Sequence, residues 1–296
     1  MKRHYFLSAF FCALATITFA QKPSTNDSAE IKKHNDTIRI GSIIIIKKHK
    51  KSNSDSSVSV ISDNANSNNK HNRSTNYFVL DIGFANWDDQ TNYTNAIGTV
   101  FSKPGSPTFS ADDMKLSAGK SANVNIWLFI QKIPLIKRNV NLKYGLGIEF
   151  NNYSFRSTVS LKEGGPLPYS VANTITNAAF VFRDSISFSK NKLNLKYLSV
   201  PFMLNFSTTK QKGKPTISAS FGVSAGYLIR QRNKQSSNER GRQKNQGDYD
   251  LQRFKLSYIA EIGLGRIKLY GSYSPKSIFE KGLDIRPYSL GLRFSN

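Results

Sequence analysis

The sequence has a single cysteine and few histidines, and their positions exclude several kinds of site. Cys12 lies in an N-terminal apolar stretch, so the chain beyond it has no disulfide framework, thiol nucleophile or thiolate metal site. The four histidines are His4, His34, His49 and His71. Because all four precede the last 220 or so residues, that region has no Ser–His or Cys–His pair and no histidine zinc site. We therefore expect no catalytic residues, metal or cofactor, and no enzyme.

Long apolar runs and acidic residues are also scarce. After residue 20, no apolar run approaches the ~20 residues of a membrane-spanning helix. The 42 Lys and Arg far outnumber the 19 Asp and Glu, which gives a formal net charge of +23. Such an excess indicates anionic partners or the solubility of exposed segments. In an exported protein, lipid phosphates and acidic envelope polymers fit better than nucleic acid.

The N-terminus has the pattern of a secretory signal peptide. Lys2 and Arg3 form a basic start, residues 5–19 an apolar core, and Ala20 ends the expected cleavage site. We therefore expect residues 1–20 to be removed on export. A lipoprotein anchor on Cys12 is the weaker alternative, because Phe11 stands where a small residue is usual.

Residues 21–75 differ in composition from the rest. They are rich in Ser, Asn, Asp and Lys and show no periodicity, which predicts a mostly disordered periplasmic tail. The exception is a β-prone segment at 36–48, which contains the run Ile43, Ile44, Ile45 and Ile46. This run is either a strand that pairs with a periplasmic partner or a strand or hairpin that packs locally, with flanking lysines that limit aggregation.

From residue 76 to 296, apolar residues alternate with polar ones in segments of about ten residues. Successive side chains of a strand point to opposite faces, and a tilted strand of roughly 9–11 residues spans a bilayer. We therefore predict an all-β fold, an antiparallel eight-stranded transmembrane β-barrel with long extracellular loops. The expected strands are about 77–86, 115–130, 139–156, 190–207, 216–230, 251–264, 266–274 and 284–295. Pro201 predicts a bulge or irregular pairing in the fourth strand.

The connections support this architecture and suggest an orientation. They are short after the second, fourth and sixth strands and longer after the first, third, fifth and seventh. Bacterial outer-membrane barrels have short periplasmic turns and longer outside loops, so we expect both termini in the periplasm of a Gram-negative bacterium. A soluble barrel would reverse the two faces. The nearly charge-free face of all eight strands favours the membrane.

Charged residues on the opposite face predict a filled lumen. They are Asp81, Lys143, Glu149, Lys255, Glu261 and Arg293. Buried charges need partners, so we expect a hydrogen-bonded, salt-bridged plug rather than a catalytic carboxylate pair. Eight strands also leave an interior that side chains fill, which argues against a wide pore.

The third long connection, about 231–250, and the residue just before it are strongly basic. Their cations are Arg230, Arg232, Lys234, Arg240, Arg242 and Lys244, against Glu239 alone. Arginine matches phosphate geometry with its planar fork. One hypothesis is a loop that contacts lipopolysaccharide phosphates; the other is a solvated, mobile loop.

Several segments together resemble the PorT-like outer-membrane β-barrel family. They are the signal peptide and the sequences DTIRIGSIIIIKK, NVNIWLFI, KNKLNLKYLSVPFMLNF and YSLGLRFSN. The resemblance implies an outer-membrane barrel without assigned activity, some of whose relatives serve secretion or gliding machinery. We expect a non-enzymatic envelope protein with a structural or interaction role, or an accessory of a secretion or assembly complex. The alternative is a narrow channel for small solutes or ions. The expected partners are outer-membrane lipids, lipopolysaccharide and an envelope protein, not nucleic acid.

Overall fold

A computed structural model describes residues 37–40, 43–47, 58–62, 74–96, 98–136, 139–208 and 216–295. The chain divides into two compact units, residues 1–69 and 70–296. The predicted signal peptide, Cys12 and the four histidines lie outside the described residues. Among the residues described, no helix is long and apolar enough to cross a membrane.

The N-terminal unit contains a small antiparallel sheet with the strand order β1-β2-β3. Its strands are β1 (Thr37–Ile40), β2 (Ile43–Lys47) and β3 (Val58–Ser62). The isoleucine run lies in β2, and its backbone pairs with β1 on one side and β3 on the other. Strands β1 and β2 lie in the predicted β-prone segment, whereas β3 lies beyond it.

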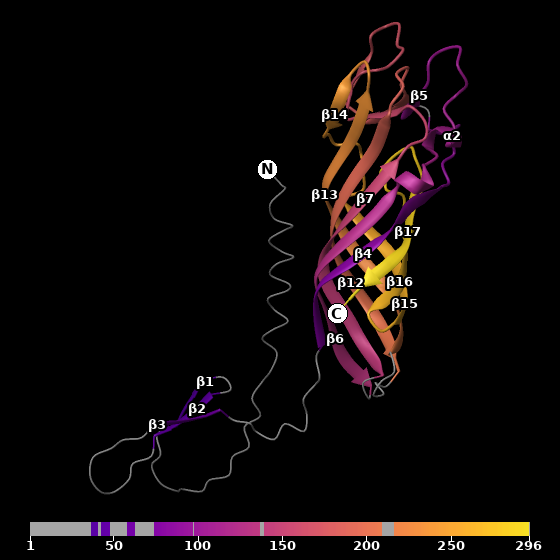
Figure 1. The fold of residues 1–296 in the computed structure, drawn as a ribbon. Helices are drawn as coiled ribbons and strands as arrows, with labels where there is room; N and C mark the ends of the chain where they lie inside the picture. Colours follow the sequence, from indigo (N-terminus) through magenta and orange to yellow (C-terminus); the bar gives the residue numbers. More distant parts are fainter. Residues whose placement is uncertain are drawn as a thin grey trace, which may run out of the picture. The chain divides into compact units, whose positions relative to one another are not determined.

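The C-terminal unit is a closed antiparallel barrel, as predicted (Figure 1). Eight strands of the described chain form its wall. They are β4 (Ser74–Asp89), β6 (Ala122–Ile136), β7 (Val140–Ser154), β12 (Lys190–Ser207), β13 (Ile217–Ser237), β15 (Phe254–Leu264), β16 (Ile267–Tyr273) and β17 (Ile285–Phe294). Each strand pairs with the next wall strand along the chain, and β17 pairs with β4 to close the ring.

The wall has an apolar outer face and a mostly polar inner face along its middle part. Strand β12 shows this clearly, because Leu198, Phe202 and Phe206 are exposed while Ser199 and Asn205 are buried. Nine residues from Leu198 to Phe206 extend about 30 Å along a strand. When tilted, they match the apolar band of roughly 25 Å that transmembrane barrels present to lipid. We call this belt the apolar band.

The second strand differs from the prediction. Residues 115–121, expected in this strand, instead form an isolated bridge at Leu116 and the short 3-10 helix η2 (Ala118–Lys120), and β6 starts at Ala122. The register with β7 shifts between Trp127 and Phe129, whereas the pairing with β4 keeps its register there. This inserts one extra residue, Leu128, and inverts the alternation beyond it. Strict alternation would put Ile130 on the same face as the exposed Ile126 and Leu128, but Ile130 is buried beside Val79 and Trp127.

Two irregularities interrupt the pairing of β12. On the β7 side the ladder runs from Ser199–Gly147 to Phe202–Tyr144, so Val200 and Pro201 are unpaired there, as expected for a proline. On the β13 side the register shifts between Lys196 and Tyr197, opposite Ile229. This second irregularity, a bulge on β13, was not predicted.

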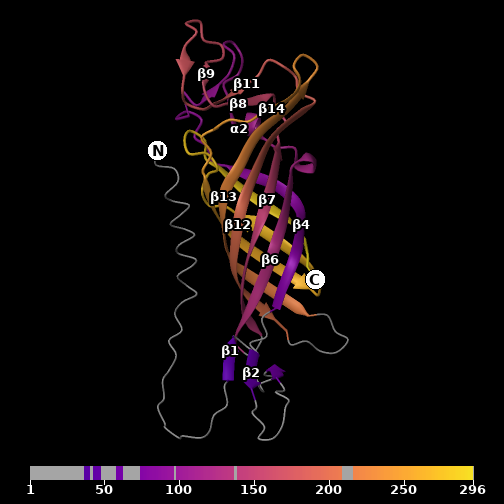
Figure 2. The ribbon, with the colours of Figure 1, turned by 90° about the vertical axis from the view of Figure 1, so that its left-hand side faces the viewer.

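Strand β13 is longer than predicted. It continues to Ser237 and forms a hairpin with β14 (Gly241–Asn245), so most of the expected basic loop is strand. Figures 1 and 2 show this hairpin rising beyond the shorter strands β15 and β16. The alternation was hidden because both faces of residues 230–237 are polar.

The long connections pack together over one end of the barrel, which we call the cap end (Figure 2). They contain β5 (Val100–Phe101), α2 (Ala111–Met114), β8 (Val159–Lys162), β9 (Gly165–Pro166), β10 (Ile175–Thr176) and β11 (Phe180–Arg183). A hydrophobic core of the cap connections and adjoining strand ends includes Trp87, Met114, Tyr153, Leu193 and Phe279. The opposite end, with the short connections, is the turn end.

Candidate functional site

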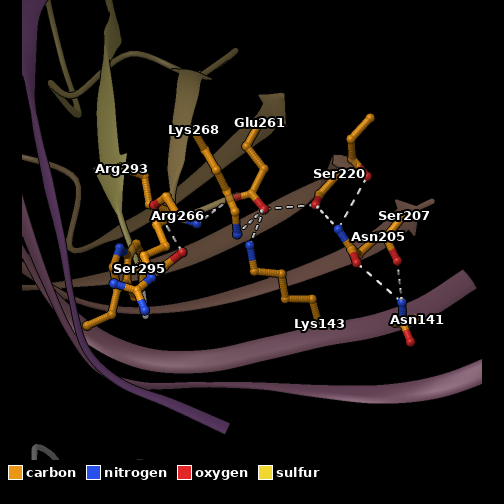
Figure 3. A network of polar contacts seen from close by, with 12 residues as sticks. Asn141, Lys143, Asn205, Ser207, Ser220, Glu261, Arg266, Lys268, Arg293 and Ser295 are labelled. Atoms are coloured by element: carbon orange, nitrogen blue, oxygen red, sulfur yellow. Dashed lines mark hydrogen bonds and ion pairs between the residues drawn. The ribbon is translucent and has the colours of Figure 1, made fainter. Parts of the chain in front are cut away.

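The barrel interior within the apolar band contains a network centred on Glu261 of β15. Its carboxylate forms ion pairs with Lys143 of β7, Lys268 of β16 and Arg293 of β17 (Figure 3). The Arg293 Nη1 atom donates at 2.6 Å, and the Lys268 Nζ atom lies at 3.7 Å. Ser220 Oγ also donates to Glu261 at 2.8 Å. Glu261 is 2% exposed, so three strands bring cations to one buried carboxylate.

Arg293 connects this centre to a second buried carboxylate, Asp81 of β4. Its Nε and Nη2 atoms donate to the two Asp81 oxygens, both at 2.7 Å, in the bidentate geometry that favours an arginine–carboxylate pair. Trp127 Nε1 and Asn125 Nδ2 donate to Asp81 at 2.7 Å and 3.2 Å. The guanidinium also lies 5.2 Å from the ring centre of Trp127. Arg293 is thus held by the carboxylates of Asp81 and Glu261 and by the aromatic ring of Trp127.

A third buried carboxylate, Glu149 of β7, pairs with Lys255 of β15. Ser224 Oγ approaches Glu149 at 3.5 Å. The Lys255 Nζ atom lies 4.6 Å from the ring centre of Tyr197, a member of the hydrophobic core toward the cap. This pair therefore lies where the polar interior meets the apolar one.

We call these seven residues the lumen network. They are Asp81, Lys143, Glu149, Lys255, Glu261, Lys268 and Arg293. Its three carboxylates all accept from cations of the network. A cavity of about 20 Å³ remains beside Glu261 and Arg293, roughly the space of one water molecule. No group of His, Cys, Asp or Glu that could hold a metal occurs among the described residues.

The structure brings together the six charged residues that the alternation placed on the inner face, and it adds Lys268. The alternation could have identified Lys268, because Ile267 and Leu269 on either side of it are exposed. What the alternation does not specify is the pairing. Asp81 and Arg293 are 212 residues apart in the chain.

The six basic residues predicted in and just before the third long connection have different positions and partners in the structure. Arg230, Arg232 and Lys234 lie on β13, and Arg242 and Lys244 on β14. Arg240 differs, because its guanidinium donates to the buried carboxylate of Asp184 at 2.7 Å. Arg240 is therefore part of the cap, held by an ion pair that its sequence position does not reveal.

Strand β12 adds three cations that sequence reasoning missed. Lys192 lies directly opposite Lys234, Lys196 opposite Arg230, and Lys190 opposite Ser236. On β14, Lys244 lies opposite Lys234 and Arg242 opposite Ser236. Directly opposed residues share one face of a sheet. This outward face, the basic face, comprises Lys190, Lys192, Lys196, Arg230, Arg232, Lys234, Arg242 and Lys244.

The isoleucine run, interpreted either as a partner-binding strand or as a strand that packs locally, has both backbone edges covered. Ile43–Lys47 is the central strand of its sheet. A partner strand would have to add to an outer edge, on β1 or β3.

Comparison with known proteins identifies a family. A family model described as the outer membrane protein beta-barrel domain matches residues 58–279, three quarters of the chain. A search of curated proteins found no match.

Proposed function

The chain belongs to the outer membrane protein beta-barrel domain family, and on this premise we propose that it is a sealed, non-enzymatic barrel with an envelope structural or interaction role. The observation that carries the proposal is the filled interior. The lumen network occupies the part within the apolar band, and the hydrophobic core occupies the part toward the cap. A barrel closed in this way offers its surfaces, rather than its lumen, for function.

The lumen network supports a structural role for its charges. Each carboxylate is buried and held by at least one cation, and Glu261 is held by three. A catalytic acid or base needs access to a substrate, and the adjoining cavity of about 20 Å³ admits little more than water. Strong mutual pairing also offsets the cost of burying so many charges.

The same observation weighs against the alternative of a narrow channel. An ion that entered would meet Arg293, which extends from β17 to contact Asp81 of β4 and Glu261 of β15. Toward the cap it would then meet Tyr197, Leu193 and Leu195, which are at most 1% exposed. Passage would require several buried ion pairs and the apolar core to open together.

Single-channel recording in a planar bilayer tests the sealed lumen. We expect the purified full chain to give no discrete conductance steps. The double variant Lys143→Ala/Glu261→Ala removes one ion pair of the network but leaves the Arg293–Asp81 pair and the apolar core toward the cap in place, so it should also give no conductance steps. Stable conductance steps from the wild-type chain would overturn the sealed barrel and favour the channel.

The resemblance to the PorT-like family supports a more specific role, that of an accessory to a secretion or assembly complex. In this proposal the short-turn end and both termini are periplasmic, as in other bacterial barrels. The N-terminal sheet would then offer its outer strand edges, on β1 and β3, to a periplasmic partner.

Crosslinking in cells tests this accessory role. A photoreactive residue at Ile61 of β3 should capture one defined envelope protein. The matched control is a photoreactive residue at Val223 of β13, within the apolar band, which should capture lipid alone. Capture of the same set of abundant proteins from both positions would refute a docking role for the N-terminal sheet.

A further inference from the structure

The eight cations of the basic face lie in rows across three strands. One row runs through Lys192, Lys234 and Lys244, which are directly opposed on β12, β13 and β14. Lys196 and Arg230 form the next pair toward the turn end. Like charges directly opposite each other destabilise a sheet. The arrangement is therefore costly unless an anion lies over it.

Within the described part of the chain, no carboxylate forms an ion pair with any cation of the basic face. The polar contacts recorded for their side chains are to neutral groups: Lys192 Nζ donates to the Lys120 carbonyl at 3.0 Å, and Arg232 Nε to Gln246 Oε1 at 3.3 Å. Cap arginines differ, since Arg183 and Arg240 each pair with an aspartate. The positive charge of the basic face is thus not paired with any carboxylate of the residues that the structure describes.

The basic face begins where the apolar band ends. On β12 the outward series changes from Leu198 to Lys196, and on β13 it changes from Ile229 to Arg230, at the bulge between the two strands. Lys196 Nζ lies 4.9 Å from the ring centre of Phe150, an apolar residue of β7. The cations are therefore placed at the depth of lipid headgroups, directly next to the acyl region.

A notch in the wall adjoins this boundary. Strand β13 pairs with β15 up to Tyr227 and with β14 only from Asn233. Between them Leu228 N donates to the Arg253 carbonyl at 2.8 Å, so the backbone ladder on this side of β13 is interrupted from Ile229 to Arg232. The notch has a volume of about 270 Å³. Its lining residues are Leu228, Ile229, Arg230, Gln231, Gln246, Gly247, Asp248, Leu251 and Arg253. Asp248 is already bound by Arg253 at 3.0 Å, whereas Arg230 has no carboxylate partner among the described residues.

The opposite side of the ring has a different charge. Strands β17 and β4 lie four positions around the barrel from β12 and β13. Their cap-side ends carry Asp88 and Asp89, and Arg286 there is paired with Asp284. An anionic surface would thus be attracted more strongly to the side of β12 and β13 than to the side of β17 and β4.

From these observations we propose that the basic face binds the phosphate groups of lipid A in the outer leaflet. The phosphates lie over the rows of Lys192, Arg232 and Lys234, and the notch beside Arg230 receives part of the sugar headgroup. The acyl chains pack on the apolar band below. This inference deepens the proposed envelope role by naming a partner, and it holds whether or not the lumen conducts.

Binding of lipid A to the full chain in detergent tests the proposal. The variant K192Q/R232Q/K234Q removes three central cations and should raise the dissociation constant for diphosphorylated lipid A about 100-fold, at about fivefold per cation. The matched control K103Q/K162Q/K276Q removes three exposed lysines outside the basic face. It should change the dissociation constant less than about twofold, and heat-dependent migration in gels should show both variants folded.

Two further arms identify the ligand. Lipid A treated with phosphatase should bind the wild-type chain as weakly as diphosphorylated lipid A binds K192Q/R232Q/K234Q. Inorganic phosphate at the same phosphate concentration should not compete, because it lacks the acyl chains that hold the headgroup at the boundary. Equal loss in the control variant, equal binding of phosphatase-treated lipid A, or full competition by inorganic phosphate would each overturn the proposal.

Discussion

The two halves of the barrel interior have opposite chemistry on the same strands. Within the apolar band, β12 buries Ser199 and Asn205 and exposes Val200 and Phe202. Toward the cap it buries Leu193 and Leu195, and three of its outward positions carry lysines, Lys190, Lys192 and Lys196. The inward and outward directions are unchanged, while the polarity inverts between Lys196 and Leu198. One strand thus follows a membrane-protein pattern in lipid and a soluble-protein pattern in water.

The physical reason lies in the medium outside the wall. In lipid, burial of apolar side chains against the barrel interior has no advantage over exposure to the acyl chains, so the interior can be polar if every group is paired. In water, the hydrophobic effect drives apolar side chains inward. The lumen network and the cap core should therefore respond differently to the loss of a single side chain.

The largest effect is expected for Glu261→Ala. This change leaves Lys143, Lys268 and Arg293 buried without their shared acceptor, and it should lower the free energy of unfolding by about 5 kcal/mol. Urea unfolding in lipid vesicles, followed by tryptophan fluorescence, measures it. The control Glu280→Ala removes an exposed carboxylate of the cap and should cost less than about 0.5 kcal/mol. Equal effects would mean that the network contributes little stability.

Trp87→Ala should have the next largest effect, confined to the cap. The ring centres of Trp87 and Tyr153 lie 4.8 Å apart, and Trp87 Nε1 donates to the Met114 carbonyl at 3.0 Å. The loss of these contacts should lower the stability of the cap by about 3–4 kcal/mol. Limited proteolysis should then cleave the long connections while the barrel keeps its gel mobility. Phe84→Ala on the same strand is the control, because Phe84 is 64% exposed and its side chain is part of the apolar band on the outer face. Cap cleavage in both variants would contradict the distinction.

Phe202→Lys tests where the polarity inverts. A lysine in the middle of the apolar band should cost about 2–3 kcal/mol of folding free energy in a bilayer. Native Lys196 occupies the same outward face of β12 six residues closer to the cap. The control Phe202→Leu keeps the site apolar and should fold like the wild type. If Phe202→Lys folds in vesicles as well as the wild type does, Phe202 does not lie within the apolar band.

The smallest effect concerns pH and the cap. Burial, followed by the carboxylate of Asp89, raises the pKa of the Tyr93 phenol, which donates to Asp89 at 2.6 Å. A raised folded-state pKa stabilises the cap below the unfolded value near 10, and this contribution is lost as the pH rises further. Protease resistance of the cap should therefore be constant from about pH 7 to 9 and fall above about 10. Tyr93→Phe, which has no ionisable phenol, should lose less resistance at alkaline pH; an identical pH profile would exclude Tyr93 as the cause.

The barrel architecture and its eight strands follow from the alternation. A two-residue period identifies a strand and its two faces without knowledge of its neighbours, which is why Asp81, Glu149 and Glu261 could be placed inside from the sequence. Errors arose where one residue was added to a strand. The irregularity at Trp127 moved Ile130 to the inner face, and nothing in the local sequence marks its position.

The basic face shows a second limit of the sequence. Residues 231–250 are so polar that they indicated a loop, although twelve of these twenty residues belong to strands β13 and β14. The lysines of β12 are about 40 residues earlier in the chain, so their proximity to Arg230 and Lys234 required the register. Arg240 is the opposite example. It is close in sequence to the cations of the basic face, but its ion pair with Asp184 makes it part of the cap.

The sequence by itself determined the eight wall strands, their up-and-down order and the inward position of Asp81, Glu149 and Glu261. These are local properties, since side-chain direction in a strand depends only on position along it. Only the tertiary structure decided which charges meet. Ring closure joins Arg293 to Asp81, and the register aligns Lys192 with Lys234. Both juxtapositions depend on how distant strands pair, which is set by the sum of many weak interactions around the ring rather than by any single segment.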